Sequence, residues 1–316
     1  MFQSQTIANL LVRTRSSFTL LLGATFLTLT FLSGQSSAAA QTSPRSPTLA
    51  ILDFGDSVLG RQAPEKLAVS LKQDRSLSIM DRDQVRAAAR GSGYTGSINL
   101  SREEARDLGA AIGSDFYLLG DAQTLRRSPS TGPAYFDSYA SLFLVSARTG
   151  RLVFWERPNF SAATAREAEE LLLTEISARM PRRLLIAIRR AQEDELIERE
   201  LAVGTHTPVI EAAPDDEKAA EAEGLRLPRP YRRITPPYPD SAAQAEAEAT
   251  VDVLVDLDAS GEVKRVELAR WAGFGLDQSA IETVKQLHFF PAMRNGVAVP
   301  MRVLLRYNFR KPARPE

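Results

Sequence analysis

Two stretches near the C-terminus decide the fold of the last part of the chain: Thr250–Leu257, TVDVLVDL, and Val299–Arg310, VPMRVLLRYNFR. Both alternate apolar and polar residues, which is the pattern of a strand with one buried face. In the second stretch the buried face is predicted to carry Val299, Met301, Val303, Leu305, Tyr307 and Phe309. The opposite face carries Arg302, Leu304, Arg306, Asn308 and Arg310, so it is largely cationic.

The residues around these two strands predict the rest of a small domain. Asp258–Gly261, DASG, reads as the turn into a second strand at Glu262–Ala269. Ser241–Glu248 is an Ala-rich helix, and Asp277 is a suitable N-cap for a helix ending at Leu287. The order helix, hairpin, helix, strand predicts an α+β domain with a three-stranded antiparallel sheet.

The same turn nearly satisfies a calcium-binding pattern. Asp256, Asp258 and Ser260 precede Gly261 and Glu267 at the spacing of an EF-hand loop. That loop requires a helix on each side, whereas both flanks here are β-branched and alternate with period two. The pattern therefore favours a hairpin turn, and we predict no metal and no cofactor.

The C-terminal pattern is similar to the TonB C-terminal domain over residues 236–310. The residues that carry the resemblance are Tyr238, Pro239, Gly261, Gly273, Leu276, Asp277, Ala280, Phe290, Pro291, Ala292, Asn295, Gly296, Tyr307, Asn308 and Phe309. The chain departs from the family pattern at Glu246 and Ala249, where glycines are usual. It also has Trp271-Ala272 in place of two small serines.

This resemblance implies a protein-binding function. The family takes up an extended peptide of an outer-membrane receptor, and a sheet that ends in a long strand can accept such a peptide as a further strand. On this reading Arg302, Arg306, Asn308 and Arg310 would contact acidic side chains of the partner. The alternative for these cationic residues is a solvated face that prevents aggregation at the sheet edge.

Residues 47–200 predict an α/β sandwich domain. Thr48–Phe54 is a short buried strand, and Tyr135–Ala147 is a longer one. Ala162–Arg190 has apolar residues roughly every four positions, which predicts a long helix kinked at Pro181. The segment resembles the periplasmic domain of CsgG and the amino domain of TolB. The matching residues are Asp53, Phe54, Asp81, Arg82, Gly109, Gly113, Asp115, Gly120, Thr149 and Gly150. The resemblance implies a scaffold that assembles side by side with copies of itself or with partners.

Two further segments lie outside these domains. Residues 1–40 contain a basic flank, the apolar run Phe18–Leu32 and small residues at Ala38–Ala40, which is typical of a cleaved signal peptide. An uncleaved membrane anchor over residues 16–40 is the alternative. Residues 201–235 are first acidic and then basic and Pro-rich, which predicts a mobile linker, with 203–236 as the tether. One interpretation of the acidic and basic segments is that they are simply exposed to solvent. The alternative is that Arg229–Arg233 contacts phosphate, peptidoglycan or an acidic partner.

Composition argues against several classes of function. The chain has 39 Lys+Arg, 39 Asp+Glu, two histidines and no cysteine, so nothing suggests nucleic-acid binding or thiol chemistry. Gly91–Gly96 matches a dinucleotide motif, but a helix precedes it and a loop follows. We therefore predict a non-enzymatic protein of the periplasm or cell envelope that binds a protein partner. The alternatives are a membrane-anchored energy transducer driven by a proton-motive complex and, with less support, a periplasmic enzyme using Asp53, Asp81 or Asp115.

Overall fold

The computed structural model describes residues 45–204, 210–214 and 216–311. The chain divides into two units, Met1–Pro44 and Arg45–Glu316, and the second contains all the described residues. The predicted signal peptide or anchor, residues 1–40, lies outside the described residues. Among the residues that the structure does describe, no helix is long and apolar enough to cross a bilayer.

The α/β half, residues 45–204, is built on a six-stranded sheet. Its strands are β1 (Thr48–Ile51), β2 (Ser78–Ile79), β3 (Phe116–Arg127), β4 (Tyr135–Ser146), β5 (Leu152–Glu156) and β6 (Asn159–Ala162). The order is β2-β1-β3-β4-β5, and β6 pairs with β4 beside β5. β1 pairs in parallel with β2 and β3, whereas β4 is antiparallel to its neighbours.

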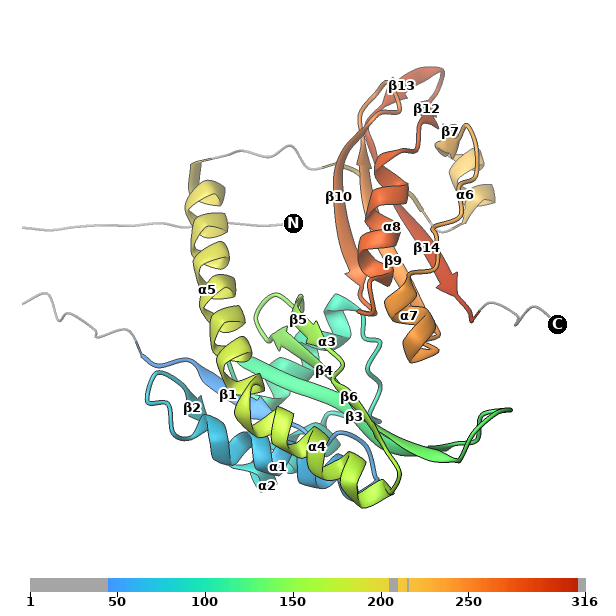
Figure 1. Cartoon of the computed structure of the whole chain (residues 1–316). Helices are drawn as coiled ribbons and strands as arrows, with labels where there is room; N and C mark the ends of the chain where they lie inside the picture. Colours follow the sequence, from blue (N-terminus) through green and yellow to red (C-terminus); the bar gives the residue numbers. More distant parts are fainter. Residues whose placement is uncertain (1–44, 205–209, 215, 312–316) are drawn as a thin grey trace, which may run out of the picture. The chain divides into compact units, whose positions relative to one another are not determined.

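Helices contribute to both faces of this sheet (Figure 1). They are α1 (Val58–Leu71), α2 (Arg82–Gly91), α3 (Arg102–Ile112), α4 (Ala165–Ala178) and α5 (Met180–Gly204). Leu49 and Ile51 of β1 pack with α1, α4 and α5, while Ala50 and Leu52 pack with α2 and α3. Successive residues of a strand point to opposite faces, so this short apolar strand is buried on both sides.

The predicted long helix is two helices. α4 ends at Ala178 and α5 begins at Met180, so Pro181 lies in the first turn of α5 and does not kink a continuous helix. Proline is tolerated there because the first N–H groups of a helix have no partner within the helix. α5 then continues to Gly204 and includes the acidic residues Glu193–Glu200, which the sequence placed outside the long helix.

The described part of the segment predicted as a mobile tether, 203–236, includes three short elements. It contains α6 (Glu217–Ala222), β7 (Leu225–Arg226) and β8 (Arg229–Pro230). Ala220 and Leu225 are buried against the C-terminal strands. Composition does not predict these elements, because two buried side chains among many charges are enough to hold a short segment on an existing core.

The C-terminal half, residues 210–311, carries the antiparallel sheet β10-β9-β14 (Figure 1). Its strands are β9 (Ala249–Leu257), β10 (Val263–Arg270) and β14 (Met301–Phe309), and its helices are α7 (Asp240–Ala245) and α8 (Leu276–Lys285). β11 (Phe289–Phe290) pairs with β8, and β12 (Ala292–Arg294) pairs with β7 and with β13 (Val297–Val299). The predicted mixed α+β chain is confirmed, and the Asp258–Gly261 segment is a hairpin turn with strands on both sides, not an EF-hand loop.

Candidate protein-binding edge

Strand β14 lies at the edge of the C-terminal sheet. It pairs with β9 along its whole length, from Met301 opposite Leu257 to Phe309 opposite Ala249. The backbone of Arg302 points away from β9, because its N–H and C=O bond to residues of the segment 210–213. Backbone directions alternate along a strand, so Leu304, Arg306 and Asn308 present their N–H and C=O groups at the same outer edge. Among the described residues, none pairs with these three positions through that edge.

The predicted cationic side chains are held by carboxylates of the same sheet. Arg302 donates two hydrogen bonds to Asp256, at 2.5 and 2.8 Å, and Arg306 donates two to Asp252, at 2.7 and 2.9 Å. Both aspartates are buried on the sheet face opposite the valines of β9. The hydrogen bonds raise the pKa of each guanidinium above its ordinary value, so both arginines stay charged.

The remaining two predicted partner-binding residues are placed differently. Asn308 accepts a hydrogen bond from the Thr250 hydroxyl at 2.9 Å, and Arg310 is exposed just beyond the end of β14. The face of the sheet that bears these residues therefore carries two arginine–aspartate pairs. Leu304, which is 49% exposed, lies between Arg302 and Arg306. Contact of these four residues with a partner stays a prediction.

Several residues of the TonB-like pattern stabilise turns. The Tyr238 hydroxyl donates to the carbonyls of Ala242 and Ala247, which holds Pro239 at the start of α7. Gly261 has φ +86°, and a Cβ there would lie 2.1 Å from the Phe289 carbonyl oxygen, so glycine is required. Further members of the pattern are the buried Leu276 and Phe309, the turn residues Asn295 and Gly296, Pro291, and Phe290, which is 57% exposed and contacts the Tyr231 ring.

Glu246 explains why the family pattern has glycine at its position. It lies at the C-terminal end of α7 with φ 51°, in the left-handed region that disfavours residues with a Cβ. Its carboxylate pairs with Lys311 at 2.8 Å. The turn therefore has a left-handed backbone at a residue that carries a Cβ.

Asp277 is not the N-cap that the sequence predicts. Helix α8 begins at Leu276 with Gly275 as its N-cap, so Asp277 lies inside the first turn. Its carboxylate accepts hydrogen bonds from the N–H groups of Ala272 and Gly273, at 2.8 and 2.9 Å. Asp277 therefore fixes the turn that follows Trp271.

A measurable pH dependence follows from this position. Burial raises the pKa of Asp277 from 3.8 to about 6, against the opposing effect of the two backbone hydrogen bonds. Because the folded pKa lies above the unfolded one, the contribution to stability is fully present below pH 3.8 and is lost as the pH rises through about 6. The loss is about 2–3 kcal/mol at 1.36 kcal/mol per pKa unit. We expect the difference in free energy of unfolding between the wild type and Asp277→Asn to fall by this amount as the pH rises from 3.8 to above 6. A difference that does not change with pH would contradict the assignment.

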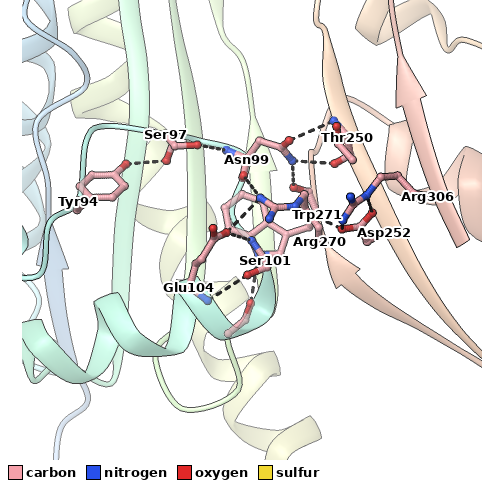
Figure 2. A network of polar contacts seen from close by, with 11 residues as sticks. Tyr94, Ser97, Asn99, Ser101, Glu104, Thr250, Asp252, Arg270, Trp271 and Arg306 are labelled. Atoms are coloured by element: carbon pink, nitrogen blue, oxygen red, sulfur yellow. Dashed lines mark hydrogen bonds and ion pairs between the residues drawn. The ribbon is translucent and has the colours of Figure 1, made fainter. Parts of the chain in front are cut away.

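The C-terminal half is bonded to the α/β half through Asn99 (Figure 2). The Asn99 side chain donates to the carbonyls of Thr250 and Trp271, at 2.9 and 2.6 Å, and accepts from the Thr250 N–H at 3.1 Å. Arg270 donates to the Asn99 carbonyl at 2.7 Å and pairs with Glu104 of α3 at 3.1 Å. Asn99 thus satisfies backbone groups at the ends of β9 and β10.

Trp271 packs into the α/β half. Its ring stacks on Phe143 of β4 with centroids 5.9 Å apart, and its indole N–H donates to the Gly150 carbonyl at 3.1 Å. The side chain is 1% exposed. Gly273 lies against the Phe143 ring, and a Cβ at this position would be 2.7 Å from the ring. The residue at which the sequence departs from the family pattern therefore docks the two halves on each other.

The motif that resembled a dinucleotide site, Gly91–Gly96, lies at the end of α2 and in the loop that leads to Asn99. Residues 92–100 form the loop between α2 and α3, and Asn99 lies at its end. The predicted interhelical loop is confirmed. Asn99 of this loop bonds to the C-terminal half, and no helix N-terminus follows Gly96 directly, as a phosphate loop would require.

The three aspartates of the enzyme alternative have structural contacts. Asp53 pairs with Arg82 and Arg86, and Asp81 caps α2 by accepting from the N–H groups of residues 83 and 84. Asp115 accepts from the N–H and hydroxyl of Thr48, at 2.7 and 2.8 Å. Each carboxylate fixes a local turn or strand end.

The sequence reading missed three residues that shape this region. Asn99 carries no local signal, since one polar residue in a loop has no pattern. Trp271 did carry a signal, because a large aromatic residue at a position where the pattern has a small one must pack against other residues of the chain. Arg294 of β12, which donates to Glu211 at 2.6 Å, stands in no periodic series with the arginines of β14.

Comparison with known proteins bears on the C-terminal half. Residues 234–310 match the family model "Gram-negative bacterial TonB protein C-terminal". The chain is also 35% identical over 79 residues to Protein TonB of Vibrio cholerae serotype O1, which is 25% of this chain and 32% of that protein. The chain thus spans about a third of the length of this curated relative.

Solved structures resemble parts of the chain at low identity. The hypothetical protein CT253 from Chlamydia trachomatis is 14% identical, with TM-score 0.31, over 43% of this chain and 96% of that one. The LpoB C-terminal domain from Salmonella enterica is 14% identical, with TM-score 0.27, over 38% and 84%. The Pseudomonas aeruginosa TonB C-terminal domain is 20% identical, with TM-score 0.24, over 28% and 90%. The resemblance of the α/β half to CsgG and TolB stays a prediction. Residues 234–310 of this chain are therefore similar to the C-terminal domain of TonB proteins.

Proposed function

We propose that this chain is a cell-envelope protein that binds an extended segment of a protein partner by strand addition to the outer edge of β14. The proposal rests on the unpaired backbone groups at the outer edge of β14. Leu304, Arg306 and Asn308 present backbone donors and acceptors that no described residue uses, on the last strand of a TonB-type domain. Such domains act in transport coupling at the envelope, and the partner on this reading is an outer-membrane receptor or another envelope protein.

The α/β half has a role in this proposal. It is bonded to the partner-binding sheet through Asn99 and Trp271, so a partner held on β14 is also held to the α/β half. We therefore propose a recruiting or coupling protein that works without catalysis. The alternative of a membrane-anchored energy transducer requires that residues 16–40 remain in the mature protein as an anchor. Mass spectrometry of the mature N-terminus distinguishes a cleaved from an uncleaved chain.

Leu304→Pro tests strand addition directly. The N–H of Leu304 faces the outer edge, so proline leaves the bonds to β9 intact while its ring blocks an incoming strand. We expect the free energy of unfolding to change little and partner binding to fall at least about tenfold, which is about 1.4 kcal/mol. Binding is read as the yield of a photo-crosslink to an envelope protein from a benzophenone amino acid placed at Arg310, which is exposed just beyond β14.

Leu304→Ser is the matched control, because it keeps the N–H and removes the apolar side chain. It should retain most of the crosslink. A second crosslinker at Lys285, in the last turn of α8, should give none of the same product. If Leu304→Pro crosslinks as well as the wild type, strand addition at this edge is wrong.

A further inference from the structure

The segment 210–213 of the chain already lies along part of the β14 edge. The Arg302 N–H donates to the Glu211 carbonyl at 2.8 Å, and the Ala213 N–H donates to the Arg302 carbonyl at 2.7 Å. Ala212 and Arg302 are thereby paired in parallel. The contact is one step of a parallel ladder, the same kind of bonding that an added strand would form.

A charge contact accompanies this pairing. The Glu211 carboxylate accepts a hydrogen bond from the Arg294 guanidinium at 2.6 Å. Arg294 is in β12, and its Nε is buried without a hydrogen-bond partner in the described part of the chain. Its only carboxylate contact among the described residues therefore comes from a segment that precedes the matched domain.

The arginines of β14 contrast with Arg294. Arg302 and Arg306 each donate two hydrogen bonds to a buried aspartate of β9, so a carboxylate from a partner would approach a charge that is already paired. Arg294 carries no such partner within the sheet. The Arg294 side chain is 40% exposed, so its guanidinium can donate to an acidic residue that takes the place of Glu211.

We infer that the β14 edge recognises a short extended segment that runs parallel to β14, with an acidic residue against Arg294 followed by small residues. This inference rests on the proposed function and names the chemistry of its partner. Glu211-Ala212-Ala213 occupies that place in the chain itself, so a partner segment must displace it. Two strand bonds and a half-exposed ion pair hold the chain's own segment, whereas a partner can also pair with Leu304, Arg306 and Asn308.

Residues 210–213, here called the self-segment, compete with a partner for the β14 edge while remaining tethered to it. A segment linked to its site by a short stretch of chain has an effective concentration of about millimolar. An external peptide therefore binds with an apparent affinity reduced by the fraction of chains in which the edge is occupied. Removing the self-segment should tighten binding of a peptide that forms the same contacts.

A labelled peptide, PVIEAAP, with the sequence of residues 208–214, is the probe, and fluorescence anisotropy with the full chain is the measurement. Glu211→Lys/Ala213→Pro removes the contact with Arg294 and the N–H that bonds to Arg302. Its matched control, Glu223→Lys/Ala212→Pro, makes the same charge change and adds the same residue. Glu223 is exposed beyond α6, and the Ala212 N–H faces away from β14. We expect the first variant to bind the probe about tenfold tighter than the wild type and the control to bind like the wild type.

A charge exchange tests the acidic position. The probe with lysine in place of its glutamate should not bind the displaced variant, and it should bind once Arg294→Glu is added. Equal affinities of the wild type and the displaced variant, or equal binding of the two probes, would overturn the inference. Failure of the proposed function is separate: the probe would behave as expected, but no envelope protein would crosslink at residue 310.

Discussion

Replacing Trp271 by serine is expected to uncouple the two halves of the described chain. The side chain is 1% exposed, stacks on Phe143 and donates to Gly150, so the variant loses an aromatic contact, a hydrogen bond and most of the buried area of one ring. Such truncations cost about 3–5 kcal/mol. Buried residues of both halves belong to one hydrophobic cluster, so the wild type should unfold in one calorimetric transition. Trp271→Ser should unfold in two.

Phe54→Ala is the control for this prediction. Phe54 is fully buried in the other hydrophobic cluster, with α1, α4 and α5, and has no contact with the C-terminal half in that cluster. It should lower the transition temperature without splitting the transition. A single transition in Trp271→Ser, at the same temperature as in the wild type, would show that the indole does not hold the halves together.

Replacing Arg302 by methionine is expected to destabilise the sheet more than the exposure of this arginine suggests. Asp256 is 5% exposed, and Arg302 supplies its two side-chain hydrogen bonds. Removing one member of a buried pair leaves an uncompensated charge and costs about 3–5 kcal/mol. The double variant Arg302→Met/Asp256→Leu removes both charges and should regain most of that loss in chemical denaturation.

Arg306→Met provides the comparison within the same strand. Its partner Asp252 keeps a second guanidinium, that of Arg270, at 3.5 Å. The loss of stability should therefore be smaller than for Arg302→Met. If Arg302→Met costs less than Arg306→Met, or if the double variant is no more stable than the single one, the pair is not the electrostatic unit described here.

The strands and the turn of the C-terminal sheet could be predicted because their information is local. Period-two alternation in Thr250–Leu257 and Val299–Arg310 fixes which residues face the core, and the buried valines of β9 follow it. The burial of Asp252 and Asp256 on the opposite face did not follow. It depends on the register that sets them beside Arg306 and Arg302, and register is a property of two strands together.

The contacts that place the domains could not be predicted for a similar reason. Asn99 and Thr250 are 151 positions apart, and neither has a sequence pattern that points to the other. Asp277 was predicted to cap α8 because its residue type suits that role, yet Gly275 with φ 76° fills the position and leaves the carboxylate for Ala272 and Gly273. Residue type gives a preference, and the three-dimensional packing decides among the positions within reach.

The buried indole of Trp271 also determines what happens when residues 234–310, which match the TonB C-terminal model, are cut out of the chain. Cleavage ahead of residue 234 would leave Trp271 and Phe274 without Phe143 and Trp155, which cover them in the intact protein. A fragment with a newly exposed aromatic surface beside an unpaired strand edge is prone to self-association. The dimers or aggregates of such a fragment would then reflect the loss of the α/β half and not an oligomeric state of the whole protein.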